Sequence, residues 1–117
     1  ITTFGGHPVS AAAAHKSLEI ILRENLTAEI DSKGKQYFNE LKHPIIKNMW
    51  GTGLFIAVEL ENEETVGRAM ELLADNGIIT DQFIFKPNAF RIAPPLIIKP
   101  REITESIQRI KRALDSI

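Results

Sequence analysis

The chain has 117 residues, no cysteine and a formal net charge of −1, with 44% hydrophobic and 25% charged residues. These values are ordinary for one globular domain, and they exclude disulfide bonds, thiol catalysis and the basic surplus of a nucleic-acid-binding protein. No apolar stretch is long enough to span a bilayer and no secretory leader is visible. We therefore expect a cytoplasmic protein with neither a nucleic-acid nor a membrane partner.

Two helices are predicted in the first third of the chain. Pro8 suits a first helical turn, and the residues after it favour helix as far as about Asn25. A second helical stretch runs from Leu26 to Leu41, where His43-Pro44 ends it. Gly34 lies inside this stretch, although glycine disfavours a regular helix.

The middle of the chain predicts a strand followed by a helix. Gly51-Thr52-Gly53 indicates a tight turn into a strand over residues 54–60. There, large aliphatic side chains at every second position alternate with Phe55, Ala57 and Glu59. Asn62 is suited to cap the next helix, and Asn76-Gly77 is a left-handed stop signal for its end.

The last third predicts short strands and one more helix. We expect a strand at 78–80, a turn at Lys86-Pro87-Asn88 and a strand at 89–93 that two prolines terminate. Pro100 opens a helix whose apolar stripe continues to Ile117. This order predicts an α+β fold, with a small, mostly antiparallel sheet and helices packed on one of its faces.

Arg91 is the most informative residue, because it lies in the otherwise apolar run 89–98, which predicts buried surroundings. A guanidinium stays charged and has a planar fork of donors suited to carboxylate or phosphate. In a strand it would share a face with Ala89 and Ala93, whose small side chains leave room for a ligand. Arg91 is thus a candidate small-anion site. The alternatives are a structural ion pair or a charge that protects a sheet edge from aggregation.

A second candidate site precedes the first helix. Gly5 and Gly6 let backbone N–H groups approach a ligand closely, Thr3 adds a hydroxyl, and the helix N-terminus adds partial positive charge. This combination is suited to a phosphate, although a plain loop leading into a helix is the alternative. The three histidines lack the spacing of metal ligands, and no Ser-His-Asp arrangement can be assembled.

Four segments, in order, resemble the C-terminal small domain of class III aminotransferases, the ornithine, acetylornithine, 4-aminobutyrate and lysine group. They are Thr3–Pro8, Trp50–Leu54, Asp75–Ile78 and Phe90–Leu96. The resemblance covers essentially all of residues 1–117. It implies the C-terminal domain of a fold-type I enzyme that depends on pyridoxal 5′-phosphate and moves an amino group from an amino acid to a 2-oxo acid.

The resemblance also implies roles for matched residues. Thr3 corresponds to the threonine that binds the cofactor phosphate of the neighbouring subunit in a homodimer, and Gly5 and Gly6 shape that loop. Arg91 corresponds to the arginine that pairs with the α-carboxylate of the amino-acid substrate. Two positions depart from the family pattern: His7 stands where asparagine is usual, and Trp50 replaces a frequent arginine before Gly-x-Gly.

The lysine that forms the Schiff base in this family precedes the Thr-Phe-Gly-Gly segment, and the chain contains no equivalent. It also begins at Ile1 rather than methionine. We therefore expect a fragment whose large cofactor-binding domain lies upstream, and which is inactive alone. Two alternatives remain open: a fragment of a same-fold pyridoxal-phosphate decarboxylase or aminomutase, and a free-standing α+β module for small-anion binding or oligomerisation.

Overall fold

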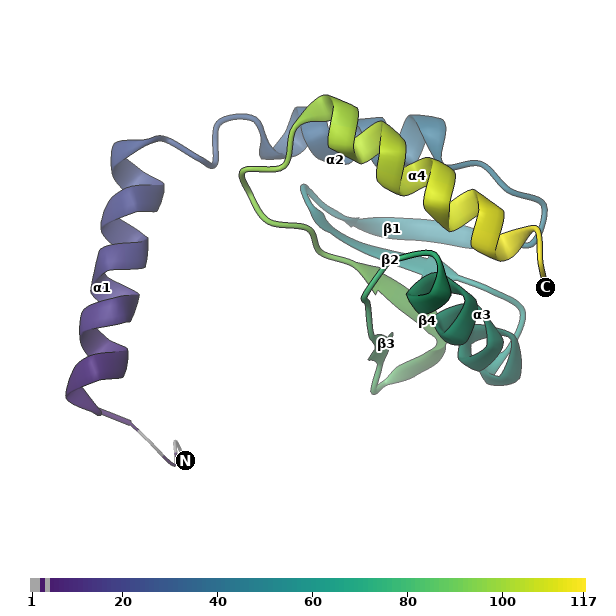
Figure 1. Cartoon of the computed structure of the whole chain (residues 1–117), viewed down its shortest axis with the longest axis horizontal. Helices are drawn as coiled ribbons and strands as arrows, with labels where there is room; N and C mark the ends of the chain where they lie inside the picture. Colours follow the sequence, from purple (N-terminus) through teal and green to yellow (C-terminus); the bar gives the residue numbers. More distant parts are fainter. Residues whose placement is uncertain (1–2, 4) are drawn as a thin grey trace.

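The computed structural model describes residues 3 and 5–117 and contains four helices and four strands (Figure 1). The helices are α1 (Pro8–Arg23), α2 (Ile30–Glu40), α3 (Glu63–Asp75) and α4 (Pro100–Leu114). The strands are β1 (Asn48–Thr52), β2 (Phe55–Glu59), β3 (Gln82–Phe83) and β4 (Lys86–Ile92).

The strands form one sheet in the order β1-β2-β4-β3, and all neighbours are antiparallel. Helices α2, α3 and α4 lie on one face of this sheet, with α4 in contact with both α2 and α3 (Figure 1). The α+β class predicted from the sequence is confirmed. The opposite sheet face, which we call the open face, carries no helix among the described residues (Figure 1).

The core lies between the sheet and these three helices. Alternate strand residues point into it, so Ile56 and Val58 of β2 and Phe90 of β4 are fully buried. Burying each such side chain contributes about 1.5–3 kcal/mol. The apolar stripe of α4 completes the core with Ile103, Ile107, Ile110 and Leu114.

Local capping explains where two of the core helices begin. The Asn62 Oδ1 atom accepts a hydrogen bond of 2.8 Å from the Thr65 N–H at the start of α3. At the start of α4, the Lys99 N–H donates to Glu102 Oε2 at 2.8 Å, beside Pro100 in the first turn. Both helix starts agree with the sequence prediction, because capping depends on residues only three positions apart.

Helix α1 stands apart from the sheet and the other helices (Figure 1). It ends at Arg23, and Asn25 follows with a positive φ of 48°, which confirms the predicted interruption near Asn25. No residue of α1 is buried, and the Leu22 side chain is 70% exposed. Its apolar positions therefore contribute nothing to the core of this chain.

Two predicted elements were wrong. Residues 78–80 are a loop rather than a strand, because the Ile78 N–H is used by the end of α3, where it donates to Leu73 O at 2.8 Å. Lys86-Pro87-Asn88 begins β4 instead of forming a turn. Pro87 is tolerated there because the β3–β4 register is irregular next to it, and the hairpin turn falls on residues 84 and 85.

Two strands, β1 and β3, were not predicted at all. β1 includes Gly51 and Thr52, which the sequence placed in a turn, and the actual turn falls on Gly53 and Leu54. Glycine is depleted in strands, so the local pattern argued against this assignment. The last helix also ends at Leu114, short of the predicted Ile117.

Candidate functional site

The open face carries Arg91 in the middle of a row that crosses three strands. Trp50 of β1 pairs with Ala57 of β2, and Ala57 pairs with Arg91 of β4. Paired residues project to the same side of a sheet, and their neighbours Ile56 and Val58 point into the core. The three side chains of the row therefore lie together on the open face.

Aromatic side chains border this row. Phe55 lies two residues from Ala57 on β2, which makes it a diagonal neighbour of Arg91 within reach of long side chains. Phe83 of β3 packs edge-on against Phe55, with 5.9 Å between ring centroids and 85° between ring planes. Ala57 is only 4% exposed although none of the described helices covers it. Side chains of the open face itself therefore shield the centre of the sheet.

A charged cluster lies at the other end of β2. Lys86 Nζ is 2.7 Å from Glu59 Oε1, and the Asn88 side-chain amide donates to the same oxygen at 3.0 Å. The hydrogen bond from Lys86, and secondly that from Asn88, lower the pKa of Glu59 below its usual value. Lys86 Nζ also lies 5.9 Å from the centroid of the Trp50 ring, within cation–π range. Lys86 thus connects Glu59 to the row that contains Arg91.

Arg91 is held by the segment that leads into β3. Its backbone N–H donates to Asp81 O at 2.9 Å, and the Thr80 hydroxyl donates to its carbonyl oxygen. Its Nη2 atom lies 3.7 Å from Asp81 Oδ2. The Arg91 side chain is 40% exposed, so the expectation of buried surroundings was wrong. The apolar neighbours Phe90 and Ile92 point into the core, whereas Arg91 points to the face without helices.

The guanidinium of Arg91 is available for a further partner. Among residues 3 and 5–117, it donates no hydrogen bond, and its one ionic neighbour is Asp81 at 3.7 Å. A planar guanidinium of this kind can bind both oxygens of a carboxylate at once. Of the two predicted small neighbours, Ala89 lies on β4 beside Arg91, whereas Ala93 follows the end of the strand. Ala57 of β2, which was not predicted, pairs with Arg91 on the same face. The geometry is that of an anion-binding group at a partly shielded surface.

The second candidate site lies at the start of α1. Thr3, Gly5 and Gly6 are exposed, and Gly6 has a φ of 77°, a conformation that favours glycine. α1 holds this loop away from the sheet, so the chain does not bring it together with Arg91 (Figure 1). The roles of Thr3, Gly5 and Gly6 remain predictions. Phe4 and the first two residues lie outside the described part of the chain.

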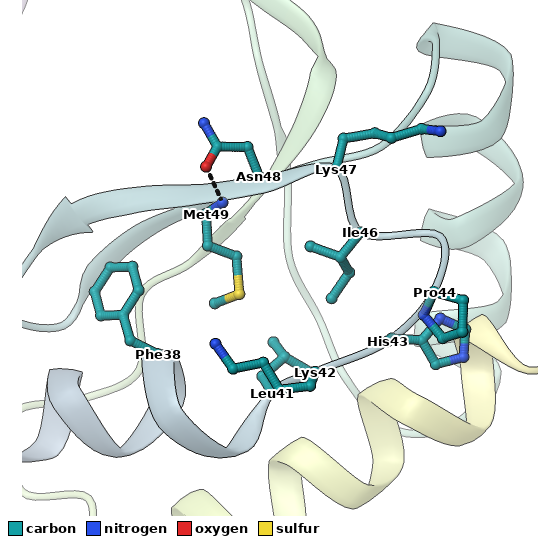
Figure 2. A pocket seen from close by; sticks show the side chains of 9 residues that line it. All are labelled: Phe38, Leu41, Lys42, His43, Pro44, Ile46, Lys47, Asn48 and Met49. Carbon is teal, nitrogen blue, oxygen red and sulfur yellow. Dashed lines mark hydrogen bonds between the residues drawn. The ribbon is translucent and has the colours of Figure 1, made fainter.

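A separate groove of about 560 Å³ lies between the end of α2 and β1 (Figure 2). Phe38, Ile46 and Met49 form its apolar lining, and Lys42 lies beside it (Figure 2). His43 is held at its edge by a 3.0 Å contact between Nε2 and Asp115 Oδ1. The groove carries no catalytic arrangement and no link to Arg91.

A smaller cavity of about 250 Å³ runs beside the backbone of Arg91, between the loop after α3 and the end of β4. Tyr37 and Ser106 belong to its lining, and their hydroxyls lie 2.8 Å apart. Among the described residues, no group of three His, Cys, Asp or Glu side chains could hold a metal ion. None of the described helices is both long and apolar enough to cross a membrane.

Comparison with known proteins identifies the family. The family model described as aminotransferase class-III matches residues 1–114. The chain belongs to the class III aminotransferases. It is 38% identical over 114 residues to the ornithine aminotransferase of Staphylococcus carnosus, across 95% of this chain and 28% of that protein. With ornithine aminotransferase 2 of Staphylococcus aureus it shares 34% identity over 113 residues, across 94% of this chain and 28% of the relative.

Solved structures agree with this class III assignment. The chain matches the ornithine aminotransferase of Toxoplasma gondii with a TM-score of 0.81 and 29% identity, over 98% of this chain and 28% of that one. The acetylornithine aminotransferase of Elizabethkingia anophelis shares the fold, with a TM-score of 0.83 and 23% identity, over 100% of this chain and 32% of that one. The chain therefore spans less than a third of these relatives.

The family resemblance read from the sequence is confirmed, but two features of the candidate site around Arg91 were missed. Asp81 lies next to Arg91 because β3 and β4 form a hairpin, and Lys86 meets Glu59 because β4 pairs with β2. One signal was present: Glu59 is the single charged residue in the otherwise apolar stretch 54–60, an anomaly of the same kind as Arg91. For Asp81, the sequence offers no comparable local signal.

Proposed function

We propose that the chain is the C-terminal small domain of a pyridoxal-phosphate-dependent aminotransferase that works as a homodimer. In this proposal Arg91 binds the carboxylate of amino-acid and 2-oxo-acid substrates. The observation that carries it is a half-exposed guanidinium on the open face with only a 3.7 Å ionic neighbour. A bidentate carboxylate pair would fix the orientation of the substrate and hence of its reacting carbon.

The loop before α1 fits the phosphate of the cofactor. His7 makes no side-chain cap at this helix, and the first turn holds no acidic residue, so no side chain there competes with a ligand for the N–H groups that precede Ala11. Thr3 and the N–H groups of Gly5 and Gly6 would hold the phosphate. When bound, pyridoxal phosphate supplies the electron sink that amino-group transfer requires. The lysine that carries it would come from the rest of the enzyme.

The matched relatives favour amino-group transfer over the alternatives left open by the sequence. They are named as aminotransferases, which supports a transfer reaction rather than decarboxylation or mutase chemistry. A free-standing anion-binding or oligomerisation module could use the same open face. Such a module would not be expected to match relatives that are more than three times its length. The amino donor is left unspecified by this proposal.

Replacing Arg91 in the enzyme that carries this domain tests the proposal. Arg91→Gln should lower kcat/KM for amino-acid substrates by roughly 30-fold, which corresponds to about 2 kcal/mol for a partly exposed charged pair. The absorption spectrum of the bound cofactor should stay unchanged. Arg101→Gln, which removes an exposed charge from the first turn of α4, is the matched control and should have no effect. An unchanged kcat/KM in the Arg91 variant would contradict the proposed clamp.

A further inference from the structure

We propose that the cavity between the loop after α3 and the end of β4 is a binding site for a neutral, mostly apolar small molecule. The molecule is about the size of a phenol and carries one hydrogen-bond donor. The inference does not depend on the proposed role of Arg91. It rests on the size and lining of the cavity and on the hydrogen bonding of the buried Tyr37 hydroxyl.

The cavity has the size and the walls of a small-molecule site. Its volume is about 250 Å³, and an apolar cavity of roughly 150 Å³ is already large enough to hold benzene. Apolar side chains line it from three segments: Phe90 and Ile92 of β4, Ile98 of the loop that follows, and Ile110 of α4. A ligand between them would remove apolar surface from water on several sides at once.

The charge of the lining indicates a neutral ligand. Among the described residues, Arg91 is the only charged one that borders the cavity, and its side chain points to the open face on the other side of the sheet. A charged group brought into the cavity would lose its hydration without gaining a counter-ion. A ligand in the cavity also leaves the guanidinium of Arg91 accessible, so it could bind at the same time as a carboxylate.

The Tyr37 hydroxyl determines which polar group the ligand needs. Tyr37 is 1% exposed, and its oxygen lies 2.8 Å from Ser106 Oγ. The single hydroxyl proton of Ser106 is donated to Ile103 O at 2.8 Å. The phenol must therefore donate to Ser106, because its own proton would otherwise be buried without an acceptor. The Tyr37 oxygen is left as an acceptor to which no described residue donates.

The neighbouring wall also favours a ligand that donates. Pro94 and Pro95 border the cavity and have no N–H groups. A ligand with one O–H or N–H group could donate to the Tyr37 oxygen while its apolar part contacts the side chains of Ile98 and Ile110. Small phenols and alcohols meet both requirements, whereas hydrocarbons meet only the second.

The test uses the full-length enzyme that carries this domain and two probes of the same shape, 4-fluorophenol and 4-fluorotoluene. Fluorine NMR titration measures the dissociation constant of each. The phenol should bind about three- to tenfold more tightly, as one additional hydrogen bond predicts. Tyr37→Phe should abolish this difference by weakening the phenol and leaving the toluene unchanged. Ser32→Ala, which removes an exposed hydroxyl from the same helix, is the matched control and should change neither constant.

Crystals of the same enzyme soaked in 4-bromophenol locate the probe through the anomalous signal of bromine. The signal should lie between Ile98 and Ile110. Its absence there would mean that water or another part of the enzyme fills the cavity, and this result overturns the inference even if Tyr37→Phe does not fold. Equal affinity of the parent for the two fluorinated probes overturns it as well. Arg91→Gln should leave 4-fluorophenol binding unchanged, so a failure of the proposed clamp and a failure of this site are distinguishable.

Discussion

Gly34 of α2 lies directly against the backbone of Gly53 in the turn between β1 and β2, with no room for a side chain between them. A Cβ atom at Gly34 would lie 2.7 Å from the Gly53 carbonyl carbon, closer than real Cβ contacts occur. Gly53 itself has a positive φ of 53°. The glycine that disfavours a helix in the sequence is therefore the one that lets α2 approach the hairpin turn.

Gly34→Ala should therefore destabilise the fold. The added methyl group must push α2 away from the β1–β2 turn, and overpacking of this kind costs about 1–3 kcal/mol. Gly67→Ala is the matched control, because a Cβ there meets nothing within 4 Å on the surface of α3. It should stabilise the chain by about 0.5–1 kcal/mol. Urea unfolding measures both changes, and equal stabilities of the Gly34 variant and the parent would refute the close contact.

We expect ionisation of the Tyr37 phenol to lower the stability of the folded chain at alkaline pH. Burial raises the pKa of its phenol above the usual 10.0, against a smaller lowering by the hydrogen bond with Ser106. The unfolded chain therefore ionises first, so the phenol's contribution is complete below about pH 10 and is lost as pH rises toward the folded pKa. Tyr37 is the only tyrosine of the chain, so near-ultraviolet absorbance follows its titration directly. Titration at the unperturbed pKa would contradict its buried position.

Tyr37→Phe should cost about 0.5–1.5 kcal/mol in the free energy of unfolding at neutral pH, because it removes the 2.8 Å hydrogen bond with Ser106. The variant should also lose the alkaline component that the phenol causes. Ser106→Ala leaves the buried phenol without this partner and should be at least as destabilising. A fully neutral Tyr37→Phe substitution would show that the hydroxyl pair contributes nothing to stability.

We expect protonation of the Glu59 carboxylate to lower the stability of the folded chain at acidic pH. Its pKa is lowered from 4.5, first by the hydrogen bond from Lys86. Because the folded pKa is depressed, the stabilisation is present above the unfolded pKa and is lost as pH falls through the folded one. Melting temperatures of the parent and Glu59→Gln should differ at neutral pH and converge as pH falls through the lowered pKa of the folded state. In a Lys86→Gln background the Glu59 substitution should have a smaller effect, and an equal effect would rule out the pair as the cause.

The chain alone is predicted to form no defined Schiff base with pyridoxal phosphate. Lys33 donates to Leu96 O at 2.9 Å and Lys86 pairs with Glu59, so two of its lysines are already engaged. Borohydride reduction of a mixture with the cofactor, followed by peptide mapping, should show scattered and substoichiometric labelling. A single lysine labelled in stoichiometric amount would show that this chain carries its own catalytic lysine.

Helix positions could be predicted from the sequence because their signals are local. Asn62 and Pro100 act on residues within one turn, and the α4 stripe repeats along a single segment. Strands were harder, because a strand is defined by its partner. Residues 78–80 resemble a strand, yet the Ile78 N–H caps α3, while the glycine-containing segment of β1 pairs with β2 throughout.

In the candidate site, too, only the feature with a local signal could be predicted from the sequence. Arg91 could be found because a charge inside an apolar run is visible along one stretch of chain. Its relationship to Asp81 depends on the β3–β4 hairpin, and that of Lys86 to Trp50 depends on strands joined through β2. The half-exposed state of Arg91 likewise depends on which sheet face the helices cover. Such facts follow from tertiary packing and have no local signal in the sequence.

The bare surface of α1 has a consequence for how the chain folds. A 16-residue helix without a buried residue has little beyond its own backbone to hold it, and isolated helices of this length are marginal in water. Its amide protons should therefore exchange with solvent long before those of α4, as a separate foldon of low protection. Binding of a partner surface over the exposed Leu18 and Leu22 side chains would therefore also stabilise the helical conformation of α1. In this domain, slowed amide exchange in α1 would thus report assembly.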